Sequence, residues 1–264
     1  MSLSIKDLFN IEGKVAVVTG GSRGIGEMIA SGFLANGAKV YITARKEEAL
    51  IAKAEELSNE YNAECIPFCA DLSKEEGITS FSNFLTEKEP EGIDFLINNA
   101  GAAWGAPFDE YPVEGWDKVV DLNLKSPFFI TQKLAKLLEK KGNSEDPSRI
   151  VNIASIDGIG VSNMADAYAY SASKSGIIHL TKHLAKTLVE RNIIVNAIAP
   201  GPFDSHMLGK AVNFDYSFIA DMNPRKRIGT PQDMAGLCIY LCSRAGAFTV
   251  GETVTCDGGM VTTR

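Results

Sequence analysis

The chain lacks the features of several protein classes. Among its 264 residues, no apolar run approaches the roughly 18 residues that suggest a membrane-spanning helix. Acidic residues outnumber basic ones by 33 to 26, and the resulting net charge of −7 argues against a nucleic-acid partner. The start (MSLSIKDLFNIEGK) lacks the basic and apolar regions of a signal peptide, and the last residues form no recognisable targeting signal. We therefore expect a cytoplasmic protein that binds neither membranes nor nucleic acid.

Patterns for disulfides and metal ions are also missing. The five cysteines are odd in number and form no close Cys-x-x-Cys pair, which favours reduced core thiols. His179 and His183 have the spacing of metal ligands on a helix, but no Glu follows His179 and no third ligand is evident. We interpret them as residues of a helix face or a subunit contact and expect no metal site.

What the chain does contain is a regular alternation of short apolar runs and longer amphipathic segments. The runs are apolar almost throughout, as in parallel strands covered on both faces, and no linker or repeat divides the chain. The sequence therefore predicts one α/β domain over residues 8–260, a doubly wound Rossmann fold with a seven-stranded parallel sheet and helices on both faces. The expected strands are residues 15–18, 40–43, 65–68, 95–97, 150–153, 193–198 and 253–255, and the expected helices are residues 24–36, 46–60, 74–88, 114–139, 168–190 and 231–242.

Two stretches interrupt this alternation. Residues 140–148 (KKGNSEDPS) are polar and predict a surface loop. Residues 202–227 have no clear period but many large apolar side chains, and such segments are often lids over binding sites. We interpret residues 202–227 as a substrate lid; two short helices packed on the core are the alternative.

Residues 15–26 have the order strand, glycine-rich turn and helix, which is typical of a dinucleotide site. Gly20 would permit the sharp turn, Gly24 would let the backbone approach a pyrophosphate, and Gly26 would allow close packing of helix and strand. The pyrophosphate would then meet amide donors at a helix N-terminus. No Lys-Ser/Thr follows the turn, which argues against an NTPase phosphate loop.

The end of the second expected strand indicates which cofactor binds. NAD enzymes usually place an acid there to accept from the ribose 2′-hydroxyl, whereas this strand ends at Arg45. Arg45 and Arg23 would bind a 2′-phosphate through charge-assisted hydrogen bonds, which favours NADP(H). Two exposed surface arginines are the alternative. Asp71, after the third strand, is expected to accept from the adenine amino group.

A proton donor is predicted near the middle of the chain. Lys174 follows Tyr170 by four residues, so the two lie on one helical face with Cβ atoms about 5–6 Å apart. The lysine charge, helped by the positive nicotinamide ring of the oxidised cofactor, should lower the pKa of Tyr170 from its usual value near 10. Ser155 follows the strand at residues 150–153, where its hydroxyl can donate to a substrate carbonyl. Tyr168 has no lysine four residues on.

These residues resemble the short-chain dehydrogenase/reductase superfamily over about residues 10–260. Within it, the chain looks most like NADPH-dependent 3-oxoacyl-(acyl-carrier-protein) reductases of the rhamnolipid-associated branch. The resemblance implies that Asn123 holds a water in a proton relay through Lys174, that Asn99 borders the cofactor, and that backbone after Gly201 holds the carboxamide. It also implies a homotetramer. The residues that carry the resemblance are TGGSRGIG at 19–26, Asn98-Asn-Ala-Gly101, Asn123, Ser155, Tyr170, Lys174, Pro200-Gly201 and Asp257-Gly-Gly259.

The full set of expected site residues follows. The catalytic residues are Asn123, Ser155, Tyr170 and Lys174. The cofactor contacts are Gly20, Ser22, Arg23, Gly24, Ile25, Gly26, Arg45, Asp71, Leu72, Asn99, Ala100, Gly101, Tyr170, Lys174, Pro200, Gly201, Phe203 and Ser205. The substrate contacts are Trp104, Asp157 and Met207, although Trp104 could instead pack and Asp157 could cap a turn.

Two departures from the family pattern leave the substrate open. The interval between Ser155 and Tyr170 is slightly longer than usual, and Ser205 stands where the family commonly has Thr, after an unusual Pro202 and Asp204. We expect an oxidoreductase that acts on a CH–OH group with NADP, reducing a ketone such as a 3-oxoacyl thioester or another bulky carbonyl compound. A sugar, polyol or steroid alcohol dehydrogenase is the alternative, and a non-catalytic NADP-binding sensor or scaffold is the alternative of another class.

Overall fold

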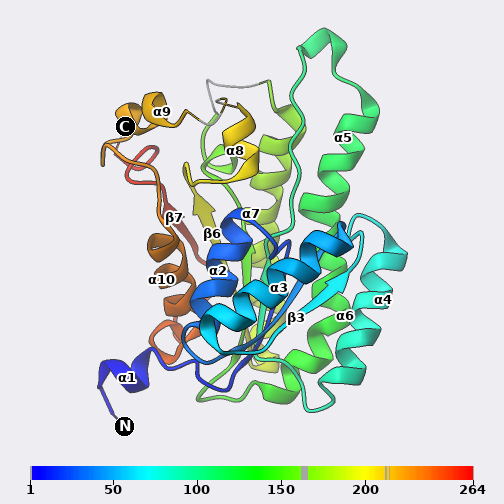
Figure 1. Ribbon diagram of the computed structural model, residues 1–264, viewed down its shortest axis with the longest axis vertical. Helices are drawn as coiled ribbons and strands as arrows, with labels where there is room; N and C mark the ends of the chain where they lie inside the picture. Colours follow the sequence, from blue (N-terminus) through cyan, green and yellow to red (C-terminus); the bar gives the residue numbers. More distant parts are fainter. Residues whose placement is uncertain (1, 162–165, 212, 214, 264) are drawn as a thin grey trace.

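The computed structural model of the protein describes residues 2–161, 166–211, 213 and 215–263. One sheet of seven parallel strands forms the centre, in the order β3-β2-β1-β4-β5-β6-β7 (Figure 1). All seven predicted strands are confirmed to within two residues at each end. Their bounds are β1 Val15–Thr19, β2 Lys39–Ala44, β3 Cys65–Cys69, β4 Phe95–Asn98, β5 Ser148–Ile153, β6 Ile193–Pro200 and β7 Thr253–Cys256.

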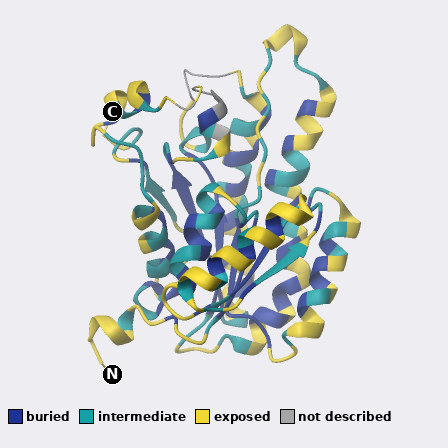
Figure 2. Cartoon of the chain, in the orientation of Figure 1, coloured by how far each residue is buried: buried dark blue, intermediate teal, exposed yellow. Residues whose placement is uncertain are grey.

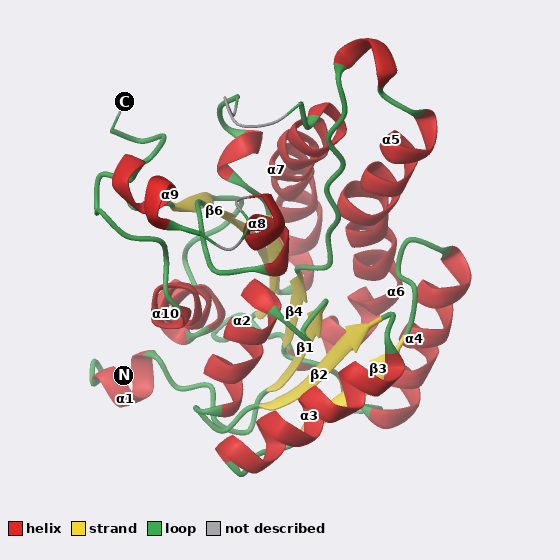
Figure 3. Ribbon diagram, turned by 45° about the horizontal axis from the view of Figure 1, so that its top comes forward, coloured by secondary structure: helices red, strands yellow, loops and turns green. Residues whose placement is uncertain are grey.

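Helices cover both faces of this sheet, as Figure 3 shows. Each of the predicted helical segments is present in the structure. The α-helices are α1 Ile5–Leu8, α2 Gly24–Leu34, α3 Glu47–Tyr61, α4 Glu75–Lys88, α5 Val113–Val120, α6 Ser126–Lys141, α7 Tyr168–Leu188, α8 His206–Ala211, α9 Ser217–Met222 and α10 Pro231–Cys242. The shorter turns are η1 Phe108–Glu110, η2 Asp121–Lys125, η3 Ile156–Gly158, η4 Val189–Arg191 and η5 Arg244–Gly246.

Alternate side chains of each strand enter two separate cores, because successive residues of a strand point to opposite faces. On one face Ala16 and Val18 of β1 pack beneath α2, α3 and α10. On the other face Val15 and Val17 pack beneath α4, α6 and α7. The central strands are buried on both sides (Figure 2), which explains why their sequences are largely apolar.

The segment expected as one helix over residues 114–139 differs from the prediction. It consists of α5, a π-helical turn η2 and α6, with Pro127 in the first turn of α6. A π-turn admits one extra residue per turn and is frequent at functional sites. The turn carries Asn123, and the apolar spacing of the sequence does not reveal it.

The loop expected at residues 140–148 is shorter, since α6 extends through Lys141 and Ser148 already belongs to β5. In the irregular segment at residues 202–227, α8 and α9 are the two short helices of the alternative interpretation. Phe203 and Ile219 of this segment are buried. Figure 1 shows α8 and α9 beyond the tip of β6, on the side where the strands end.

Because all strands are parallel, their carboxyl ends share one edge of the sheet. The chain order reverses between β1 and β4, which lie side by side. In open α/β sheets a ligand crevice forms at such a reversal. Most of the predicted cofactor residues lie in turns at this edge, whereas Asn123 lies in η2 and Tyr170 and Lys174 lie in α7. Within the described ranges, no helix has the length and apolar character required to cross a bilayer.

Candidate active site

The turn after β1 has the geometry of a phosphate cradle. Gly20 and Gly24 have φ angles of +66° and +57°, which side chains rarely allow. A Cβ at Gly26 would collide with the carbonyl oxygen of Gly20 and the amide of Asn99. The sharp turn expected at Gly20 and the close packing expected at Gly26 are therefore present, the approach of a pyrophosphate to Gly24 stays a prediction, and α2 begins with its amide donors at this turn.

A hydrogen-bond clamp joins this turn to the one after β4. Asn99 Nδ2 donates to the carbonyl oxygens of Thr19 and Gly20 at 2.8 and 3.1 Å. In return, Thr19 Oγ1 accepts from the amides of Asn99 and Ala100 at 2.9 and 3.0 Å. Asn99 thus shapes the cradle directly. Thr19 is a site residue that the sequence analysis missed, although its place immediately before Gly20 was a usable signal.

The expected ribose and adenine end lies after β2 and β3. Arg45 after β2 is exposed, as is Arg23 in the turn after β1, and no acidic residue ends β2. Burial raises the pKa of Asp71, but hydrogen bonds from Ser73 and the charge of Arg45 outweigh it and lower that pKa. Asp71 Oδ1 accepts from the amide and hydroxyl of Ser73 at 3.1 and 2.7 Å. Asp71 is thus held ionised near Arg45, and Ser73 is a second missed residue.

Ser155 lies two residues past the end of β5 and begins the turn η3. Its Oγ accepts from the backbone amide of Asp157 at 3.1 Å, so its own hydrogen is free to point elsewhere. Ser171 Oγ donates to the carbonyl oxygen of Asp157 at 2.6 Å, which ties η3 to α7. Ser155 is therefore held beside the first turn of α7, the turn that carries Tyr170.

Lys174 is buried on the inner face of α7. Its Nζ donates to the carbonyl oxygen of Ile153 at 2.6 Å and lies 5.6 Å from the centre of the Tyr170 ring. Burial lowers the pKa of Lys174 to about 8. Burial raises the pKa of Tyr170 to about 12, the charge of Asp157 adds to this, and a hydrogen bond with Ser155 acts the other way.

In the protein without its cofactor the pKa of Tyr170 is thus raised, and the lowering expected with Lys174 and the oxidised nicotinamide ring stays a prediction for the NADP-bound protein. Desolvation of the phenolate is the largest cause of the raised pKa, and the Lys174 ammonium donates to a backbone carbonyl. The structure does bring Ser155, Tyr170 and Lys174 together as expected. Tyr168 is exposed, and its hydroxyl donates to Asp166 at 3.2 Å.

Asn123 is buried between the turn after β4 and α7. Its Oδ1 accepts from the amide of Ala102 at 2.8 Å, and its Nδ2 donates to Ala102 O and Ser173 Oγ at 2.9 and 3.1 Å. A Cβ placed on Gly101 would lie 3.3 Å from Asn123 Oδ1 and 3.8 Å from Lys174 Nζ. Gly101 thus leaves space open between the two expected relay residues.

The turn after β6 comes close to the phosphate cradle. Gly201 N donates to Cys256 O at 2.9 Å, and a Cβ on Gly201 would press on Asp257. Ser205 accepts from the amide of Leu208 at the start of α8, and its Cβ would lie 3.2 Å from a Cβ on Gly24. The segment after β6 therefore crosses above the glycine turn.

Some of the other predicted contact residues pack within the protein, and the rest lie at the site edge. Phe203 is buried, and its ring fills the space over Gly229. Trp104 packs its ring on Gly115 of α5 and beneath Lys118, whose Nζ is 5.0 Å from the ring centre. Met207 lies in α8, but its side chain is outside the described part of the structure. The remaining expected contacts follow strands at the site edge: Ser22 and Ile25 after β1, Leu72 after β3, Ala100 after β4 and Pro200 at the end of β6.

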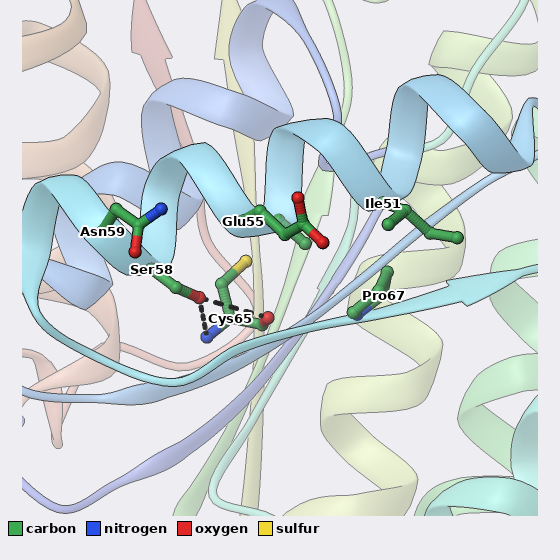
Figure 4. Close-up of a pocket in the computed structure, with 7 residues that line it drawn as sticks. Ile51, Glu55, Ser58, Asn59, Cys65 and Pro67 are labelled. Carbon is green, nitrogen blue, oxygen red and sulfur yellow. Dashed lines mark hydrogen bonds between the residues drawn. The ribbon is translucent and has the colours of Figure 1, made fainter.

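A separate hollow lies between α3 and the edge strand β3 (Figure 4). Ser58 of α3 bonds there to the backbone of Cys65, and burial raises the pKa of the Cys65 thiol to about 12. Cys65 is therefore an inert thiol, and the hollow carries no reactive group. Its lining residues are Ile51, Ala54, Glu55, Ser58, Asn59, Cys65 and Pro67.

Thiols and histidines elsewhere add no site. All five cysteines are free, and Cys69 is exposed at the end of β3, unlike the core thiol that we expected. His179 and His183 lie on the outer side of α7 with ring centres 5.1 Å apart. Across the described residues, no three His, Cys, Asp or Glu side chains are grouped as metal ligands would be.

Comparisons with known proteins agree with this geometry. The family model described as enoyl-(acyl carrier protein) reductase matches residues 20–261. A rhamnolipid-biosynthesis 3-oxoacyl-(acyl-carrier-protein) reductase of Pseudomonas aeruginosa is 44% identical over 95% of this chain and 97% of its own length. The Pseudomonas aeruginosa RhlG/NADP active-site complex superposes with a TM-score of 0.90 at 42% identity, covering 96% and 98% of the two chains.

A relative with a different substrate is similar in fold. L-Sorbose reductase from Gluconobacter frateurii, in complex with NADPH and L-sorbose, has a TM-score of 0.88 at 28% identity and covers 97% of this chain and 99% of its own. The similarity thus spans reductases of quite different ketones, while the glycine turn, Ser155, Tyr170 and Lys174 occupy one sheet edge. The chain belongs to the short-chain dehydrogenase/reductase superfamily of oxidoreductases.

Proposed function

We propose that this protein reduces the ketone of a 3-oxoacyl thioester to a secondary alcohol, with NADPH as the hydride donor. The observation that carries the proposal is the placement of Ser155, Tyr170 and Lys174 at the same sheet edge as the Gly20–Gly24 turn. A hydride donor and a proton donor can then meet at one carbonyl group.

The residues at the edge fit a phosphorylated dinucleotide. The cradle admits close approach because a side chain at Gly20, Gly24 or Gly26 would be strained or would collide. Arg23 and Arg45 would hold a 2′-phosphate, in the absence of an acid at the end of β2. NADPH, when bound, supplies the hydride.

Ser155 and Tyr170 would act on the carbonyl oxygen. Ser155 already accepts from the amide of Asp157, so its hydroxyl can donate to the substrate oxygen and stabilise developing negative charge. Tyr170 remains protonated at neutral pH because burial raises its pKa to about 12, and it can therefore give its proton to the alkoxide. Lys174 and Asn123 would return a proton to Tyr170 through the space beside Gly101.

The acyl thioester is supported by the names of relatives and by the apolar residues of 202–227, which would act as a lid. A sugar or polyol ketone is the second candidate, supported by the likeness to L-sorbose reductase. NADPH oxidation, followed by absorbance, should be compared across 3-oxoacyl thioesters, enoyl thioesters, keto-sugars, diketones and steroids. Higher kcat/KM for L-sorbose than for every 3-oxoacyl thioester would overturn the substrate assignment.

A non-catalytic NADP sensor is the alternative of another class. Such a protein has no need for a proton donor, whereas this site has Tyr170 beside a buried Lys174. NADPH binding by fluorescence with no turnover of any carbonyl in the same screen would support the sensor and contradict the enzyme.

We also infer a homotetramer and a cytoplasmic location. Trp116 of α5 and Phe129 of α6 are 43% and 37% exposed, which is more apolar surface than a monomer needs there. Light scattering should give four times the mass of one chain, and a monomer at working concentration would refute the tetramer. Cell fractionation tests the location.

A further inference from the structure

The residues after β7 form a short folded tail (residues 257–263) at the sheet edge that carries the site. Gly258 and Gly259 have φ angles of +66° and +90°, which allow the chain to turn sharply there. Each oxygen of the Asp257 carboxylate then accepts a backbone amide at 2.8 Å, one from Gly259 and the other from Val261. These bonds fix the course of the tail and the position of Val261.

The tail lies between the lid segment and the turn that follows Ser155. On the side of the lid, Asn223 is 2% exposed, and its Nδ2 donates to the carbonyl oxygen of Asp257 at 2.9 Å. Figure 1 accordingly shows the C-terminus beside α9. On the other side, a Cβ placed on Gly160 would lie 4.0 Å from Cγ1 of Val261. The tail therefore joins the lid segment to the turn η3 of the active site.

The turn that leads to Gly160 is itself fixed on the catalytic helix. Ser171 Oγ donates to the carbonyl oxygen of Asp157 at 2.6 Å, and Ser175 Oγ donates to that of Gly158 at 2.9 Å. A Cβ on Gly158 would also collide with the backbone of α7. Both segments that meet at Gly160 and Val261 are thus held by hydrogen bonds before any substrate binds.

Open space lies beside Gly160. Apart from the chain neighbours of Gly160, Val261 alone among the described residues comes within 4.0 Å of a Cβ placed there. Gly160 is five residues after Ser155, which is roughly 10 Å at a helical rise of about 2 Å per residue. Ile159, in the same turn, is 50% exposed. An apolar surface therefore lies within reach of a substrate whose carbonyl oxygen meets Ser155.

We propose that Val261, with Ile159 and Gly160, forms a wall against which the acyl chain of the substrate packs, so that Val261 determines which chain lengths are accepted. Contact with this wall would remove chain methylenes from water, which is favourable. The polar arm of a thioester carrier fits the wall poorly, because the Asp257 carboxylate already accepts two amides. The inference rests on the proposed function for the nature of the substrate.

The first test compares kcat/KM for the 3-oxododecanoyl and 3-oxobutanoyl thioesters of coenzyme A. Val261→Phe and Gly160→Val fill the same space from two segments, so each should lower the ratio of long to short substrate at least about tenfold. The short substrate and the Kd for NADPH should stay within about threefold of wild type, which shows that the fold is intact. Thr262→Phe, at an exposed position of the same tail, should keep the wild-type ratio. An unaltered ratio in Val261→Phe or in Gly160→Val, or an equal fall in Thr262→Phe, would overturn the proposal.

A double variant tests whether the two residues border one space. Val261→Ala removes the atoms that a side chain at residue 160 would meet. Added to Gly160→Val, it should bring the ratio of long to short substrate back to within about threefold of wild type, because residues in contact are not additive. Additive effects of the two changes would show separate spaces and would refute the shared wall.

A binding experiment separates this inference from the proposed function. Calorimetry can follow the 3-hydroxydodecanoyl and 3-hydroxybutanoyl thioesters of coenzyme A binding to the NADP-bound Tyr170→Phe protein, without turnover. Adding Val261→Phe should weaken the long ligand at least about tenfold and the short one less than about threefold. If no thioester is reduced but this difference appears, the proposed function fails and the wall stands. Equal weakening of both ligands, or no binding of the long one before Val261 is changed, refutes the wall.

Discussion

Lys174 Nζ donates to the carbonyl oxygen of Ile153 at 2.6 Å, linking the catalytic helix α7 to the last residue of strand β5. The same atom is 5.6 Å from the centre of the Tyr170 ring. The hydrogen bond holds the Lys174 ammonium group near the Tyr170 ring. Its acceptor, Ile153, is two residues before Ser155 in the chain. The position of Lys174 is therefore set by the sheet as well as by its spacing from Tyr170 on the helix.

Replacing Tyr170 by Phe should remove the proton donor and leave the fold unchanged. We expect kcat to fall by about 10²–10⁴-fold, with the Kd for NADPH within about threefold of wild type. Tyr168→Phe is the control, since that hydroxyl bonds to Asp166 on the outer side, and it should keep wild-type turnover. Turnover retained by the Tyr170→Phe protein would show that another group is the acid.

Arg45→Asp should reverse the preference for NADPH over NADH. The change removes a charge-assisted bond to the 2′-phosphate and adds an acceptor for a 2′-hydroxyl, so the preference ratio should fall at least about 10–100-fold. Lys133→Asp makes the same charge change at an exposed position on α6 and should leave the ratio unaltered. Equal kcat/KM with both cofactors in the wild type would contradict this assignment.

Lys174→Met should abolish activity and yet stabilise the cofactor-free protein near neutral pH. The folded pKa of Lys174 is about 8, below its unfolded value of about 10.4. Burial of this charge therefore costs stability fully below pH 8, and the cost fades as pH rises to about 10.4. Loss of the bond to Ile153 offsets part of the gain, which leaves about 1–2 kcal/mol.

Urea unfolding at about pH 7 and pH 9.5 measures this effect. The stabilisation should shrink at the higher pH, because the wild-type lysine is then largely neutral in the folded state. Lys182→Met, an exposed change on the same helix, should stay within about 0.5 kcal/mol of wild type at both values. A Lys174→Met protein less stable than wild type at about pH 7 would refute the prediction.

Residues 202–227 should close over the substrate. Tyr216 donates to Asp204 at 2.6 Å and so joins the start of this segment to α9. Backbone hydrogen exchange of residues 203–211 and 217–222 should slow when NADPH and a slow substrate bind. Equal protection with and without ligands would mean that α8 and α9 are static packing.

Variants of the same segment test its role in specificity. Tyr216→Phe should speed exchange of α8 in the ligand-free protein, whereas Tyr240→Phe, which loses a bond to the distant Thr249, should not. Met207→Ala should change the ranking of substrates by acyl length more than NADPH affinity. We expect the same of Phe214→Ala, at a position outside the described residues.

The sequence by itself determined the fold and the positions of the chemistry. Parallel strands covered on both faces are largely apolar, so β1 could be predicted from its sequence. The positive φ angles of Gly20 and Gly24 belong to a turn that few other residues can form. Tyr170 and Lys174 are four residues apart on one helix, so their shared helical face could also be predicted from the sequence. Local periodicity and turn chemistry carry such information without reference to distant residues.

Only the tertiary structure decided the burial, the hydrogen-bond partners and the pKa shifts of these residues. The π-turn at Asn123, the Thr19–Asn99 clamp and the bond from Lys174 to Ile153 join residues far apart in the chain. In the protein without its cofactor, burial raises the pKa of Tyr170, because desolvation depends on all the atoms packed around a group and not on one neighbour four residues away. Burial and partners across the sheet edge are properties of the assembled fold, and spacing along the chain does not contain them.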